Sequence, residues 1–223
     1  MSNGVPMKRE MDRIVIFDLD DTLVHSNAVR EAFACVARER GIDAALMTRT
    51  LDTLPGRPAQ DIFECLGLDP ETAQAATDRF LARLDELNGE VPTVPYADAH
   101  ETLNELAARG CTLALSTGSP PERARQILDR EGWDAFQVVL GSTDSCRKGR
   151  AHYEQMDART PDKRWARRAI TVGDSPADMR LGVEHGVPIR IGIDRDGDPR
   201  PLLAAGATHV VRGLSDILHI IPA

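Results

Sequence analysis

Three carboxylates follow a short apolar run near the start of the chain, and their spacing suggests chemistry. Residues 14–17 (IVIF) are β-branched or aromatic, the composition of a strand buried on both faces. Asp18, Asp20 and Asp21 come directly after it. Like charges this close cost free energy unless a cation or a reacting phosphate compensates them. The stretch therefore predicts a metal- or phosphate-handling site at a strand end. The alternative is an acidic turn in which Asp20 or Asp21 caps a helix.

A second acidic pair occurs late in the chain, in the stretch GDSPAD. Asp174 and Asp178 are four residues apart, a spacing that places them on one side of a turn opening a helix. Together with Asp18 they offer the hard oxygen ligands that Mg²⁺ prefers. Taken alone, each of the two could equally be a turn or cap residue.

Two further stretches carry groups that can hold a phosphate. Thr117 and Gly118, in LALSTGS, offer a hydroxyl and backbone N–H groups, and Lys148, in SCRKGR, offers a positive charge. Each has an ordinary alternative: Thr117 as a helix N-cap near Pro120, and Lys148 as solvated surface.

The elements that must position these groups alternate between strand and helix from residue 98 onward, the pattern of a parallel α/β sheet. Strands are expected at residues 13–17, 112–115, 138–140, 168–172, 189–193 and, at an edge, 210–211. In such a sheet the carboxyl ends of the strands meet at one edge, where ligands bind. Residues 194–201 resemble a linker, and residues 214–221 are expected to form a closing helix.

No strand pattern occurs between residues 24 and 91, where helical spacing predominates. We expect an all-helical insert at 24–94, with its apolar stripes forming its own core. Gly56 and Arg57 lie between two of its helices. Arg57 is a candidate substrate-binding residue for a second charge on the substrate, with a surface arginine as the alternative.

Composition narrows the classes of partner and the cellular location. A net charge of −8 over 223 residues makes nucleic acid an unfavourable partner. No window approaches the ~20 apolar residues of a membrane span, and residues 1–12 lack the apolar core of a signal peptide. The four cysteines show no CxxC spacing, which favours reduced thiols, with Cys35 and Cys65 on helix core faces. A cytoplasmic protein is expected.

The motifs DLDDT, LALSTGS, RKG and GDSPADM, in this order, resemble those of the haloacid dehalogenase-like hydrolase superfamily. The helical insert resembles the cap of its phosphoglycolate phosphatase-like and β-phosphoglucomutase-like members. The resemblance implies a Rossmann-like three-layer α/β/α core with a parallel sheet, at residues 1–23 and 95–223, and a small helical cap at 24–94. It also implies a Mg²⁺-dependent phosphatase that acts on a small phosphorylated metabolite through an aspartyl-phosphate. Both a monomer and a homodimer are compatible with the sequence.

The same resemblance implies a role for each motif residue. Asp18 is the nucleophile, and Asp20 is the general acid and then the general base. Thr117 and Gly118 bind the phosphate, and Lys148 braces both Asp18 and the phosphate. The metal ligands are Asp18, the backbone carbonyl of Asp20, and Asp174, with Asp178 orienting or completing the shell.

This sequence departs from the family pattern beside the lysine. Gly149 stands where relatives usually have proline, and the adjacent Arg147 is an alternative to Lys148 as the phosphate-bracing cation. His25 stands where the family often has an acidic residue, so it either faces the cleft between cap and core or is a solvated loop histidine.

Other functions use some of the same groups. A phosphomutase shares the aspartyl-phosphate, and an assay for a sugar bisphosphate intermediate would distinguish it. A 2-haloacid dehalogenase needs neither Mg²⁺ nor an acid two residues after the nucleophile, so Asp20, Asp174 and Asp178 argue against it. Phospho-acceptor signalling modules are shorter and lack the helical insert. A non-catalytic binding protein would have little reason to keep all these groups.

Overall fold

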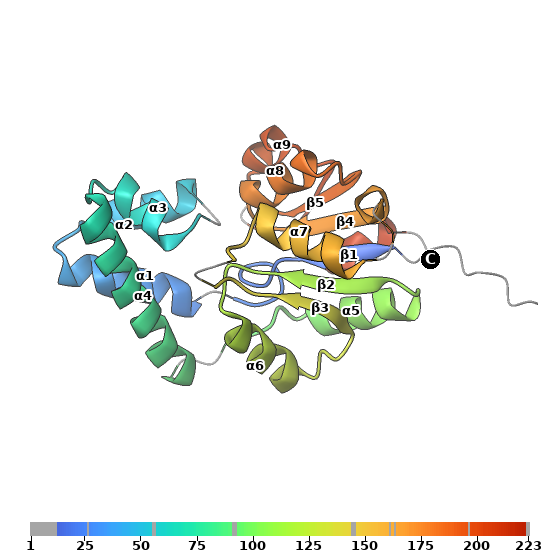
Figure 1. Ribbon diagram of the computed structural model, residues 1–223, viewed down its shortest axis with the longest axis horizontal. Coiled ribbons are helices and arrows are strands. Elements are labelled where there is room, and N and C mark those ends of the chain that lie inside the picture. Colours follow the sequence, from blue (N-terminus) through green and yellow to red (C-terminus); the bar gives the residue numbers. More distant parts are fainter. Residues whose placement is uncertain are drawn as a thin grey trace, which may run out of the picture.

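A six-stranded, all-parallel sheet forms the centre of the molecule (Figure 1). The structure is a computed structural model that describes residues 13–25, 27–54, 57–90, 93–143, 146–160, 162, 164–195 and 197–221. Residues 1–12 and Gly56, on which the sequence analysis drew, lie outside these residues. The strands are β1 (Ile14–Phe17), β2 (Thr112–Ser116), β3 (Phe136–Leu140), β4 (Ala169–Gly173), β5 (Ile189–Ile193) and β6 (His209–Val211), in the spatial order β3-β2-β1-β4-β5-β6.

Helices cover both faces of this sheet because side chains along each strand alternate between them. Val15 and Phe17 of β1 pack in one cluster with α5 (Ala99–Ala108), α6 (Pro121–Glu131) and the 3₁₀ turn η2 (Ser215–His219). Ile14 and Ile16 pack in another with α7 (Arg150–Arg159), the 3₁₀ turn η1 (Trp165–Arg168) and α8 (Pro176–Glu184). The result is the predicted Rossmann-like α/β/α core with its three layers.

Strand β1 lies between β2 and β4, and the pairing register aligns their ends. Phe17 is opposite both Leu115 and Val172, so the residues that follow these three strands leave the sheet at one edge. The Asp18 N–H still donates to the Val172 carbonyl, at 3.0 Å. This register brings the first acidic motif beside the second.

Helices α1 (Asn27–Glu39), α2 (Ala44–Thr53), α3 (Ala59–Cys65) and α4 (Pro70–Glu90) form a separate lobe (Figure 1). Their apolar faces make a cluster of their own, in which the rings of Phe33 and Phe80 stack with centroids 4.2 Å apart. Two adjacent segments join the lobes, with Val24 bridged antiparallel to Pro95. On this basis we propose that residues 24–94 are an inserted cap domain and that residues 1–23 and 95–223 belong to the core.

The expected closing helix is present as the 3₁₀-helix η2. Other expected details are wrong. The last part of the linker-like stretch opens α9 (Arg200–Ala204). Cys65 is exposed and Cys35 half-buried, so they do not belong to the cap core, although all four cysteines are free thiols. Short apolar residues at these positions fit either face of a helix, so spacing alone misassigned them.

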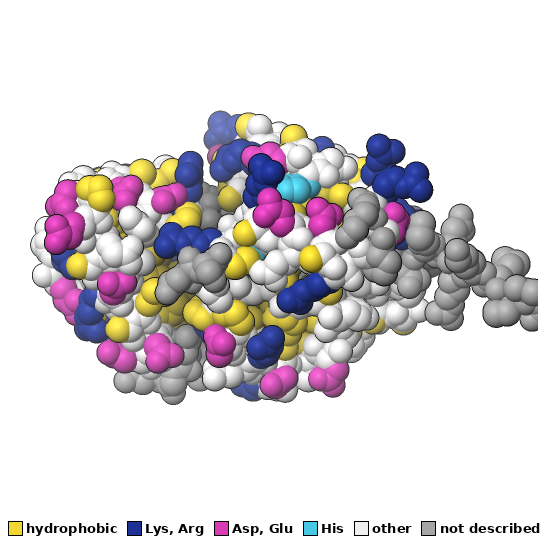
Figure 2. Space-filling view, in the orientation of Figure 1, with side chains coloured by type: hydrophobic (Ala, Val, Ile, Leu, Met, Phe, Trp, Pro, Cys, Tyr) yellow, Lys and Arg dark blue, Asp and Glu magenta, His cyan; other side chains and the backbone are white. Residues whose placement is uncertain are grey.

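Within the described ranges, no helix combines the length and apolar character that a bilayer crossing requires. Figure 2 shows acidic and basic side chains interspersed over both lobes on the face that it presents. On that face the charge is spread rather than gathered into one patch of a single sign.

Candidate active site

Asp18 stands at the carboxyl end of β1 and is 9% exposed. Its Oδ1 lies 2.9 Å from the Nζ of Lys148, which reaches the same edge from the segment after β3. The same ammonium lies 2.7 Å from Asp178 Oδ1. Lys148 therefore bridges the first and the last acidic motifs, which are 160 residues apart in the sequence.

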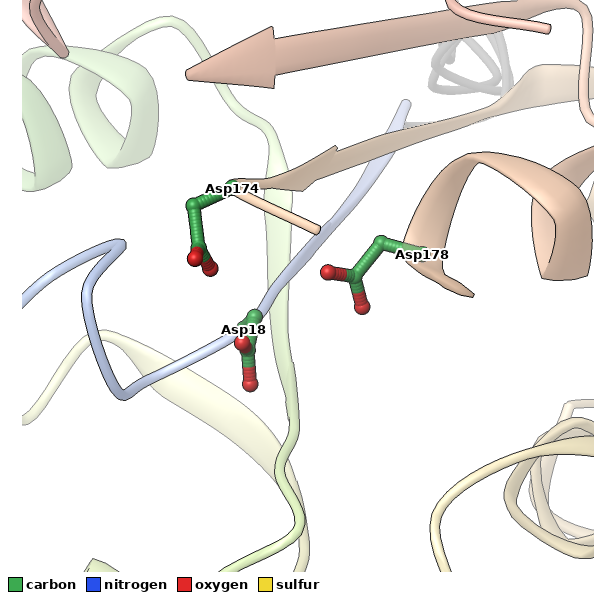
Figure 3. A group of neighbouring side chains, drawn as sticks. All are labelled: Asp18, Asp174 and Asp178. Carbon is green, nitrogen blue, oxygen red and sulfur yellow. The ribbon is translucent and has the colours of Figure 1, made fainter. Parts of the chain in front are cut away.

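Asp174 follows β4 and Asp178 lies in the first turn of α8, and both side chains converge with Asp18 on one small region (Figure 3). One carboxylate oxygen from each lies within 4.8 Å of the others. Asp174 is also held by a residue that the sequence analysis did not single out: the Thr22 hydroxyl donates to Asp174 Oδ1 at 3.0 Å, and the Asp174 N–H donates to Thr22 Oγ1 at 3.1 Å.

Local sequence explains how Asp178 reaches this position. Ser175 is the N-cap of α8, Pro176 occupies its first turn, and Ser175 and Asp178 form a capping box, with Ser175 Oγ 2.6 Å from Asp178 Oδ2. Gly173 is required because a Cβ there would come 2.4 Å from that oxygen. The cap-residue alternative for Asp178 is thus correct as far as it goes, but the side chain also binds Lys148.

Burial sets the electrostatics of this group. Burial away from water raises the pKa of the Asp18 carboxyl to about 7; the Lys148 ammonium opposes this rise, and the charge of Asp178 adds to it. The pKa of Asp174 is also raised, first by burial and then by the charges of Asp18 and Asp178. Burial lowers the pKa of Lys148, but the charges of Asp178 and Asp18 outweigh it, so the net shift is upward. Lys148 supplies one positive charge against three carboxylates. This all-oxygen donor set with surplus negative charge fits a divalent cation such as Mg²⁺.

The structure shows how Lys148 and its two neighbours, Arg147 and Gly149, are arranged. The side chain of Lys148 is only 12% exposed, so the alternative of solvated surface is wrong. Arg147 is exposed, whereas Lys148 contacts Asp18. Gly149 has a φ of 139°, which a proline ring, fixed near −65°, cannot adopt. The chain therefore turns into α7 here by a route that a Lys-Pro pair cannot follow.

Thr117 and Gly118 follow β2 at the same edge. Thr117 is fully buried, and its Oγ1 accepts a hydrogen bond from the Ser119 N–H at 3.0 Å, a contact that does not use the hydroxyl proton. Gly118 is exposed, and a Cβ there would meet no atom within 4 Å, so a ligand can approach its backbone. Ser116 points elsewhere, with its Oγ 2.9 Å from Nδ1 of the buried His152. Burial lowers the pKa of that histidine to about 4.

The side chain of Asp20 is not part of the carboxylate cluster formed by Asp18, Asp174 and Asp178. It is held instead by Ser119 and by Arg123 of α6, neither of which sequence reasoning identified as functional. Ser119 adjoins the phosphate-binding motif, and Arg123 precedes the buried Ile127 by one helical turn. The position of Arg123 on the apolar side of its helix was therefore the available signal that this arginine is buried. The sequence did not identify its partner, Asp20, which is 103 residues away.

The remaining candidates lie toward the helical lobe. Arg57 is half-exposed, with its Nη1 3.4 Å from Oδ2 of Asp61 one helical turn on. His25 is exposed and its ring centroid lies 4.0 Å from that of Tyr96, in the segment that leads back to the sheet. Among the described residues, neither side chain forms a hydrogen bond or an ion pair with Asp18, Asp174 or Asp178.

Comparison with known proteins identifies relatives along nearly the whole chain. The chain is 32% identical to a phosphoglycolate phosphatase from Rhodospirillum rubrum, over 90% of this chain and 87% of that protein. It is 26% identical to the pyrophosphatase PpaX of Halalkalibacterium halodurans, over 93% and 95% of the two chains. The crystal structure of a predicted phosphatase from Clostridium acetobutylicum shares the fold, with a TM-score of 0.80 at 23% identity over 94% of this chain and 98% of that one.

The profile of the haloacid dehalogenase-like hydrolases matches residues 15–191, a range that includes all four motifs. These matches confirm the resemblance inferred from the motifs. The chain belongs to the haloacid dehalogenase-like hydrolase family.

Proposed function

We propose that the protein is a Mg²⁺-dependent phosphatase that hydrolyses a small phosphorylated metabolite through an aspartyl-phosphate on Asp18. The observation that carries the proposal is the contact between Asp18 and Lys148 inside a group of three carboxylates, of which Asp18 and Asp178 are buried and Asp174 is half-buried. A carboxylate attacks phosphorus only if its own charge and that of the phosphate are offset. The relatives named as phosphatases support the same reaction class.

In the first step, an oxygen of Asp18 bonds to phosphorus, the ester P–O bond breaks, and Asp20 gives its proton to the leaving oxygen. In the second, a water oxygen attacks phosphorus, the bond to Asp18 breaks, and Asp20 takes a proton from the water. Lys148, Thr117 and the Gly118 backbone hold the phosphate oxygens throughout.

Asp18, Asp174 and the backbone carbonyl of Asp20 would hold Mg²⁺, which when bound supplies positive charge that favours ionised Asp18 and offsets the phosphate charge. Asp178 is better placed to orient than to ligate, because its two oxygens already bind Lys148 and Ser175.

The test is release of inorganic phosphate from a panel of phosphorylated metabolites and 4-nitrophenyl phosphate, with Mg²⁺ and with EDTA. The phosphoglycolate phosphatase relatives make 2-phosphoglycolate the first compound to try. We expect release with Mg²⁺, no release with EDTA, and recovery when Mg²⁺ is restored. No release from any compound would contradict the proposal. It would direct attention to a sugar phosphomutase, assayed through its bisphosphate intermediate, or to a dehalogenase.

Arg57 is proposed to bind a second negative charge on the substrate, since its guanidinium is exposed beside the start of α3. Arg57→Ala should raise KM about tenfold for a metabolite that carries a second anionic group, such as a carboxylate, besides its phosphate. It should leave KM for 4-nitrophenyl phosphate, which has no such group, nearly unchanged. Arg49→Ala, which removes an exposed arginine from α2, is the matched control and should alter neither KM. Equal effects of Arg57→Ala on both substrates would remove it from this role.

A further inference from the structure

We infer that Arg123 is a positioning residue for Asp20: its guanidinium, with the Ser119 hydroxyl, holds the Asp20 carboxyl where it exchanges protons with the substrate oxygen and with water. The inference rests on the proposed function, because it assigns Asp20 the proton-transfer role. It adds to the site a residue from α6, a helix that carries none of the four sequence motifs.

The contacts define the orientation of the Asp20 carboxyl. Arg123 Nη2 lies 2.9 Å from Oδ1, and Arg123 Nη1 donates to Oδ2 at 3.1 Å, so the guanidinium approaches both oxygens. Ser119 Oγ lies 2.6 Å from Asp20 Oδ2 and 2.6 Å from Arg123 Nη1. Because a guanidinium only donates, the hydroxyl accepts from Arg123 and directs its own proton to Asp20. Contact of a planar cation with both oxygens, through one hydrogen bond and one ion-pair approach, restricts rotation of the carboxyl more than a single contact would.

The side chains of Arg123 and Asp20 differ in how deeply they are buried. The Arg123 side chain is 6% exposed, whereas that of Asp20 is 21% exposed and keeps access to solvent. A cation buried this deeply is costly unless it is paired. Its pairing with the less deeply buried side chain of Asp20 fits a role in holding that carboxyl.

The same loop links this pair to the proposed phosphate site. The Ser119 N–H donates to Thr117 Oγ1 at 3.0 Å, while its hydroxyl binds Asp20. Ser119 therefore ties the hydroxyl that would hold the phosphate to the carboxyl that would transfer the proton. Loss of Arg123 should disturb proton transfer more than phosphate binding.

Substrates with different leaving groups distinguish a role of Arg123 in proton transfer from a purely structural role. An alkyl leaving oxygen needs a proton as its bond to phosphorus breaks, whereas 4-nitrophenolate leaves without one. We expect Arg123→Met to lower kcat/KM at least about tenfold for the best alkyl phosphate of the panel, and less than about threefold for 4-nitrophenyl phosphate. Arg123→Lys should recover part of this loss, because it restores charge without the two-point contact.

Controls test whether the effect passes through Asp20. Arg125→Met, which removes an exposed arginine from the same helix, should leave both substrates unaffected. In an Asp20→Asn background, Arg123→Met should cost little further activity, since residues that act as a unit are not additive. If Arg123→Met does not fold, Ser119→Ala tests the same assembly and should shift the ratio between the two substrates in the same direction.

Two results would overturn the inference: an equal loss for both substrates, or the same loss from Arg123→Met with and without Asp20. Either requires an active wild-type enzyme. A wild-type protein that releases no phosphate from any ester contradicts the proposed function itself, so the two failures are distinguishable.

Discussion

Replacing Asp18 by asparagine is expected to abolish turnover while the fold stays intact. The amide keeps the size of the side chain but cannot form an acyl phosphate, so phosphate release should fall by at least about 10³-fold. The fold should tolerate the change, because Asp18→Asn removes one of three mutually repelling carboxylates and Lys148 keeps its contact with Asp178. The measurements are phosphate release with Mg²⁺, the circular dichroism spectrum and the thermal unfolding midpoint.

Asp21→Asn is the matched control for this variant. Asp21 lies in the same acidic turn, and its φ of 57° is a conformation that asparagine adopts as readily as aspartate. It should retain most of the activity. If Asp18→Asn kept activity within tenfold of the wild type, or if Asp21→Asn were the more damaging change, Asp18 would not be the nucleophile.

Replacing Lys148 by methionine is expected to lower both activity and stability. Methionine keeps the unbranched stem but removes the ammonium that contacts Asp18 and Asp178. Removing one partner of a buried ion pair typically lowers the free energy of unfolding by about 3–5 kcal/mol. Loss of a charge aimed at the transferring phosphate should lower kcat by about 10²–10³-fold. Urea unfolding followed by circular dichroism, and phosphate release, measure the two effects.

Mg²⁺ and Arg147 provide the controls for Lys148→Met. Because a cation that binds only the folded state stabilises it, Mg²⁺ should raise the unfolding midpoint of this variant. Arg147→Met changes an exposed side chain and should leave activity and stability unchanged. The opposite ranking, with Arg147→Met the worse variant for activity, would assign the phosphate-bracing role to Arg147.

Local patterns in the sequence were sufficient to predict the core architecture and the acidic residues of the site. Apolar runs such as residues 14–17, buried on both faces, allow few alternatives to a central strand. Because parallel strands deliver their carboxyl ends to one edge, the carboxylates that follow β1 and β4 were expected at that edge, and the pairing of β1 with β4 makes them neighbours there. The spacing of Asp174 and Asp178 likewise predicted a turn that opens a helix, and the structure places Asp178 in the first turn of α8.

Only the tertiary structure decided which charged groups pair at the site. Lys148 and Arg147 are adjacent, and local sequence does not specify which side chain turns toward Asp18. In the structure it is Lys148, and the next residue, Gly149, has a positive φ. Arg123 is one of several arginines in its helix, and its function depends on Asp20, which is 103 residues away. Hydrophobic periodicity records burial along one element, whereas an ion pair across the sheet edge depends on how separate elements pack. That is why the carboxylates and a cation near Lys148 could be expected from the sequence, whereas the choice between Lys148 and Arg147 and the pairing of Arg123 with Asp20 could not.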